Sequence, residues 1–161
     1  MPAGMRRALT VGLPLIAAAA SILAAAVEIA FLVSPAAGFC PEHPGFLSYC
    51  FFPPSSVATF TIWLALGLTV VSVISCVFAW RGRLGAAGAS ALPGLIGVVV
   101  VLLAALANQN SPSADQLQNT PPEGYWLYGF GGAAVLVGMV LLAAACCVQL
   151  AVRFARIRRP L

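Results

Sequence analysis

Cys40 and Cys50 bracket nine residues of a proline-rich segment and could form a disulfide or act as a thiol redox pair. In an oxidising compartment outside the cytoplasm, the ordinary state of such a pair is a disulfide. In the chain-entropy model, closing so short a loop stabilises the fold by about 3 kcal/mol. A redox enzyme would need a Cys-x-x-Cys pair or a second pair in the outer loops to relay electrons, and the sequence has neither. We therefore expect a structural Cys40–Cys50 disulfide.

Glu28 is the only charged residue inside a long apolar run. An ionisable side chain within a membrane is by default a functional-site hypothesis. The partners expected to hydrogen-bond it are Asn108, Gln109, Tyr125 and Tyr128. A proton or cation pathway normally contains several polar groups in a row, and this run offers one. We expect a structural, hydrogen-bonded Glu28, with a cation site as the alternative.

The remaining metal-binding or nucleophilic side chains form no recognisable motif. His43 is the only histidine, whereas a membrane haem of the b type needs axial histidines and zinc needs about four ligands. Cys76, Cys146 and Cys147 are expected to pack as small apolar side chains. The sequence thus predicts no catalytic residue, no cofactor and no metal site.

The composition indicates which elements must position these residues. Apolar residues make up 61% of the chain and charged residues 7%, so a water-exposed surface cannot be built from it. About 20 apolar residues cross a bilayer as a helix. Four runs are long enough: 8–33, 57–80, 84–107 and 125–152. We predict an all-α integral membrane four-helix bundle, with residues 1–161 forming one polytopic domain with short irregular loops.

Arginine placement predicts the orientation of this bundle. All eight basic residues are arginines, and they lie before the first run, in the inner loop 81–83, or in the tail 153–161. These segments share one side after four crossings, and the positive-inside rule places that side in the cytoplasm. Residues 34–56 and 108–124 are then the outer loops. We predict a multi-pass protein of the cell membrane with both termini cytoplasmic.

The net charge of +4 could indicate nucleic-acid binding in a polar protein, but here the arginines are confined to segments flanking apolar runs. They are better explained as topology signals and contacts with anionic lipid. We expect the tail to bind the anionic membrane surface through Arg153, Arg156, Arg158 and Arg159.

The first apolar run also has features of a secretory signal. Arg6 and Arg7 precede it, and Ala24, Ala25 and Ala26 could form a small-residue cleavage site. Cleavage would leave three spans and an outer N-terminus. The run is longer than the 7–15 apolar residues of a signal core, so we expect it to stay uncleaved.

Small residues predict close helix packing, as in the step from Ala134 to Gly138, and Pro93 predicts a kink. With packing features but no catalytic motif, the sequence favours a non-enzymatic accessory or scaffold subunit. Its expected partners are the lipid bilayer and other membrane proteins or further copies of the chain, and not nucleic acid. The alternatives are a transporter or channel component that uses Glu28, and a membrane thiol oxidoreductase that uses Cys40 and Cys50.

Overall fold

The computed structural model describes residues 3–39, 54–107 and 123–157. Within these ranges the chain forms four long helices and one short 3-10 helix. They are α1 (Ala3–Leu32), η1 (Pro35–Gly38), α2 (Pro54–Trp80), α3 (Leu84–Ala107) and α4 (Tyr125–Ile157). Each long helix has the length and apolar composition needed to cross a membrane. The predicted all-α class with four helices of spanning length is confirmed.

Three helices extend beyond their apolar runs. Helix α1 begins at Ala3 instead of residue 8, α2 begins at Pro54 instead of residue 57, and α4 ends at Ile157 instead of residue 152. Hydropathy marks the apolar stretch, but a helix continues until a residue breaks its backbone bonds. No glycine or proline follows Gly138 until Pro160, so Arg153 and Arg156 lie on the last turns of α4 and not in an irregular tail.

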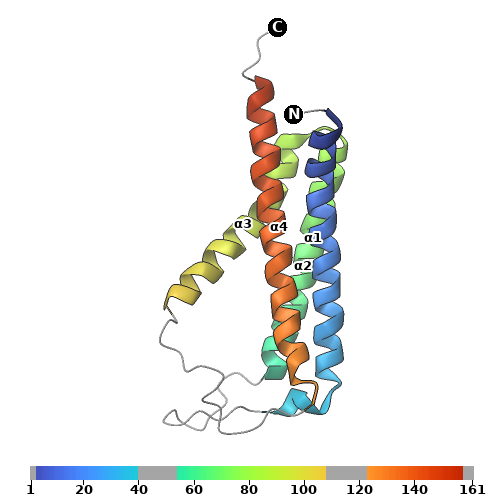
Figure 1. The fold of residues 1–161 in the computed structure, drawn as a ribbon, viewed down its shortest axis with the longest axis vertical. Coiled ribbons are helices and arrows are strands. Elements are labelled where there is room, and N and C mark those ends of the chain that lie inside the picture. Colours follow the sequence, from blue (N-terminus) through green and yellow to red (C-terminus); the bar gives the residue numbers. More distant parts are fainter. Residues whose placement is uncertain (1–2, 40–53, 108–122, 158–161) are drawn as a thin grey trace.

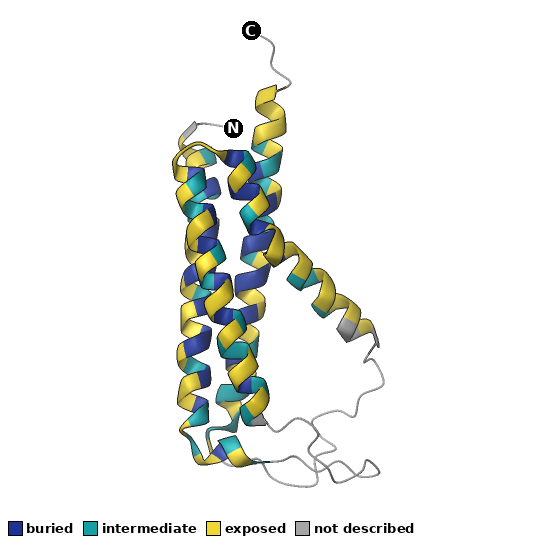
Figure 2. Cartoon of the chain, turned by 180° about the vertical axis from the view of Figure 1, so that it is seen from behind, coloured by how far each residue is buried: buried dark blue, intermediate teal, exposed yellow. Residues whose placement is uncertain are grey.

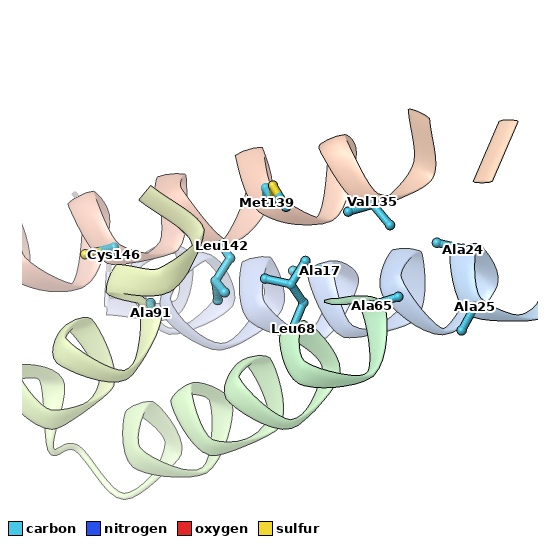
Figure 3. Close-up of a cluster of buried hydrophobic side chains, with 10 residues drawn as sticks. All are labelled: Ala17, Ala24, Ala25, Ala65, Leu68, Ala91, Val135, Met139, Leu142 and Cys146. Atoms are coloured by element: carbon cyan, nitrogen blue, oxygen red, sulfur yellow. The ribbon is translucent and has the colours of Figure 1, made fainter. Parts of the chain in front are cut away.

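Helices α1, α2 and α4 lie side by side along most of their length (Figure 1). The beginning of α1, the turn between α2 and α3, and the end of α4 gather at one end of the bundle. Buried side chains follow the inner faces of the helices (Figure 2). Fully buried alanines such as Ala17, Ala24 and Ala65 contribute much of the core, which lets the helix backbones approach closely (Figure 3).

The turn from α2 to α3 is a Schellman motif. Gly82 has a φ of 74°, a left-handed conformation that glycine adopts without a steric penalty. The Arg83 N–H donates to the Phe78 carbonyl at 2.9 Å, and the Gly82 N–H donates to the Ala79 carbonyl at 3.0 Å. These bonds satisfy the Phe78 and Ala79 carbonyls near the end of α2, and the chain reverses between Trp80 and Leu84.

Helix α3 crosses α4 through small residues. Its contacts pair Gly88 with Leu150, Gly94 with Leu142 and Gly97 with Met139. A Cβ added at any of these glycines would lie 2.7–2.9 Å from the facing side chain, so the helices meet here only because Cβ is absent. Beyond this crossing α3 diverges from the other helices (Figures 1 and 2).

Helix α3 contains a proline, and its second half is exposed. Pro93 lies inside α3, and a proline within a helix removes a backbone hydrogen bond and bends the axis. The second half of α3 is mostly exposed, as at Leu102, Leu103 and Leu106. The kink expected at Pro93 therefore coincides with a helix that leaves the bundle.

Candidate functional site

Glu28 lies on α1 and is completely buried against α4. Its carboxyl group fills the space over Gly131, where an added Cβ would collide with it. The sequence predicted a structural carboxyl group that is hydrogen-bonded to residues of other helices. The structure places it between two helices, with no exposed surface.

Neither carboxyl oxygen of Glu28 has a hydrogen-bond partner among the described residues. The hydrogen bonds expected from Tyr125 and Tyr128 are therefore absent, and Asn108 and Gln109 lie outside the described residues. The two tyrosine rings pack on Phe31 instead, with centroid separations of 6.4 and 5.5 Å. A buried carboxyl group without partners can hold a proton or contribute oxygen ligands to a cation.

The described cysteines occupy packing positions. Cys146 is buried and donates its thiol to the Gly88 carbonyl at 3.3 Å, whereas Cys147 is exposed on another face of α4. Within the described ranges, no three His, Cys, Asp or Glu side chains are grouped as metal ligands. The predicted disulfide residues Cys40 and Cys50 lie outside these ranges, so their pairing stays a prediction.

Gln149 forms a polar contact between helices that the sequence analysis did not identify. It is fully buried on α4 and donates its amide to the Thr10 carbonyl of α1 at 3.0 Å. That carbonyl would normally accept the N–H four residues later, but Pro14 stands there and has none. Gln149 therefore satisfies the carbonyl that Pro14 leaves unpaired.

Two more helices join this contact through Ser75 of α2. The Gln149 amide lies 3.1 Å from the Ser75 hydroxyl, and that hydroxyl lies 3.1 Å from the Ala87 carbonyl of α3. The Gln149 network, formed by Thr10, Ser75, Ala87 and Gln149, thus links all four long helices. A proline inside an apolar run was the available signal, because it calls for a donor from elsewhere in the fold.

Among the described residues, no helix lies beside one face of α4. Met139 contacts α3, and steps of three and four residues place Leu136, Gly132 and Gly129 on the same face. A Cβ added at Gly129 or Gly132 would meet nothing within 4 Å, and Leu136 is 40% exposed. We call these three residues the uncovered α4 face; it is uncovered because α3 has diverged.

The arginine-rich end of the bundle contains two open pockets. The first, of about 450 Å³, is lined by Arg6, Arg7, Arg81 and Arg156 together with Trp80. The second, of about 460 Å³, is lined by Arg83, Arg153 and Arg156 together with Ile157. Arg153 and Arg156, predicted as tail residues, therefore meet arginines from other elements, while Arg158 and Arg159 lie outside the described residues.

The chain can be compared with known proteins at the level of family, sequence and structure. No protein-family model, no curated protein sequence and no solved structure matches it.

Proposed function

We propose that this chain is a non-enzymatic, four-span protein of the cell membrane that serves as an accessory or scaffold subunit of a larger membrane protein. In this proposal the arginine-rich end and both termini face the cytoplasm, as the positive-inside rule requires. The uncovered α4 face receives a transmembrane helix of the partner.

The observation that carries the proposal is the departure of α3 from α4. Leu142 and Met139 of α4 pack against Gly94 and Gly97 of α3. Farther along the same face of α4, a Cβ added at Gly132 or Gly129 would meet none of the described residues within 4 Å. An apolar helix surface in lipid gains little from apolar character alone, because lipid tails are equally apolar. Helices associate in lipid when small residues let their backbones approach closely, and Gly129 and Gly132 give this face of α4 such residues.

The first test is a bulky substitution on the uncovered α4 face. Gly132→Leu fills the space that a partner helix would occupy, whereas Gly67→Leu adds the same atoms to α2, where an added Cβ also meets nothing within 4 Å. Both variants should keep the thermal stability of the purified chain. In the native host membrane, Gly132→Leu should abolish co-purification of a defined partner that wild type and Gly67→Leu retain.

Equal co-purification by both variants would contradict this docking site. If the purified complex contained only copies of this chain, the partner would be another copy of the chain and not a larger membrane protein.

A second candidate, a transporter or channel component, is favoured by the carboxyl group of Glu28, which is buried and has no hydrogen-bond partner among the described residues. Proton or sodium flux into liposomes measures it directly. Flux in wild type that disappears in Glu28→Gln, at unchanged thermal stability, would favour transport over the scaffold proposal. A thiol oxidoreductase using Cys40 and Cys50 remains the third candidate, and redox titration of that pair tests it.

A further inference from the structure

The two arginine-lined pockets are neighbours that share Gly82, Leu84 and Arg156 in their linings. Arg156 lines both pockets, with Arg7 and Arg81 beside it in the first and Arg83 and Arg153 beside it in the second. These arginines come from α1, the α2–α3 turn and α4, so the fold brings together charges that are distant in the sequence. Like charges at close range repel, which makes a bound anion favourable.

The backbone adds to the positive potential. Leu84 and Gly85, the first residues of the 24-residue helix α3, line the second pocket. The first N–H groups of a helix lack internal acceptors and favour a negative group. Among the described residues that line the two pockets, none is Asp or Glu.

Apolar side chains accompany the arginines in both pockets. Trp80 lines the first and Ile157 lines the second, and both are largely exposed. A ligand held here would therefore have anionic groups against the arginines and hydrocarbon against the outer surfaces of the helices. Paired arginine groups also match the oxygens of a phosphate group.

We propose that this end of the bundle binds an anionic phospholipid with two phosphate groups, one in each pocket, with Arg156 between them. Basic pockets between helices at the cytoplasmic side of a membrane are suited to such headgroups. The inference goes beyond a charged tail, because it requires the α2–α3 turn as well as α4. It depends on membrane insertion but not on a protein partner, so it can fail or succeed independently of the scaffold function.

The test titrates the full-length protein in neutral detergent micelles with three lipids: cardiolipin, phosphatidylglycerol and phosphatidylcholine. Lipid retention by native mass spectrometry and the shift in thermal midpoint are measured. When the lipids are compared at equal total phosphate, the concentration that half-saturates the protein should be at least tenfold lower for cardiolipin than for phosphatidylglycerol. Phosphatidylcholine should not saturate the protein. Pyrophosphate without lipid should cause no comparable shift.

Two substitutions locate the site. Arg156→Gln should weaken cardiolipin binding about fivefold or more, as expected for one arginine near an anionic group. Arg156→Lys keeps the charge but removes the paired N–H groups that match a phosphate, and it should weaken cardiolipin binding at least twofold. Unchanged binding in Arg156→Lys would overturn the site in favour of diffuse surface attraction.

A charge-neutral variant provides a further check. The Arg153 guanidinium lies directly over Gly85, where an added side chain would displace it. Gly85→Val should weaken cardiolipin binding at least threefold, whereas Gly67→Val should leave it unchanged. Unaltered binding in Gly85→Val, or equally tight binding of pyrophosphate, would overturn the proposed lipid site.

Discussion

Pro14 and Gln149 form a matched pair on different helices. Proline at position 14 leaves the Thr10 carbonyl without its helical donor, and the Gln149 amide supplies one at 3.0 Å. Hydrogen bonds between membrane helices contribute about 0.6 kcal/mol on average, and an unsatisfied buried carbonyl adds to the loss. Gln149→Leu should therefore lower the free energy of unfolding by about 1 kcal/mol.

A double-mutant cycle tests the pairing in mixed detergent micelles. In the Pro14→Ala background, the N–H at position 14 can satisfy Thr10, so Gln149→Leu should cost only a few tenths of a kcal/mol. An equal cost in both backgrounds would show that Gln149 acts independently of the proline.

The carboxyl group of Glu28, which has no hydrogen-bond partner in the described part of the chain, gives a second prediction at the residue scale. Burying a polar group without a hydrogen bond costs about 1–3 kcal/mol. Glu28→Met keeps an unbranched chain over Gly131 but removes the polar atoms, so it should raise the free energy of unfolding by about 1 kcal/mol. Glu28→Gln keeps the polar atoms and should give no such gain; a loss of stability in Glu28→Met would reveal a bound partner of the carboxyl group.

The sequence identified Glu28 but not its surroundings, and it did not identify Gln149. A lone acid in an apolar run is visible from composition, whereas its position over Gly131 depends on the rotation of two helices. Gln149 is unremarkable as a single glutamine near the end of a run. Its role depends on Thr10, Pro14 and Ser75, which lie on other helices.

At the scale of helices, hydropathy predicted all four elements, because lipid-crossing length and apolar composition are properties of the sequence. It could not predict which small residues meet. Gly138 lies over Ser21 of α1, so the step from Ala134 to Gly138 serves packing inside the bundle. At Gly129 and Gly132, in contrast, an added Cβ would meet none of the described residues within 4 Å.

This difference between glycines can be measured by adding one methyl group to each. A Cβ at Gly94 would lie 2.7 Å from Leu142 Cβ and 3.0 Å from the Ala143 backbone nitrogen, neither of which can move easily. Gly94→Ala should lower the free energy of unfolding by about 2 kcal/mol through overpacking. Gly132→Ala should be neutral or slightly stabilising, since alanine favours helix over glycine. A comparable loss in Gly132→Ala would mean that α3 packs along the whole of α4.

At the scale of the whole molecule, the beginning of α1, the α2–α3 turn and the end of α4 lie at one end of the bundle (Figure 1). The described arginines lie on these segments, which leads to a topology prediction. Reporters fused at residue 1 and residue 161 should both be cytoplasmic, because all eight arginines then lie on the side that the positive-inside rule favours. If the N-terminal reporter were lost and the new N-terminus lay outside the cytoplasm, the first apolar run would be a cleaved signal. Such cleavage after Ala26 would also remove the buried Ala17 and Ala24 from the core.

The central claim is that a larger membrane protein docks on the uncovered α4 face. A photoreactive phenylalanine analogue in place of Leu136 should cross-link to one defined protein in the native membrane. The same analogue in place of Ile74 of α2, which is 41% exposed against 40% for Leu136, should not. The cross-link from position 136 should also disappear when Gly132→Leu is added. Cross-linking to lipid alone, or an identical protein adduct from both positions, would contradict the account.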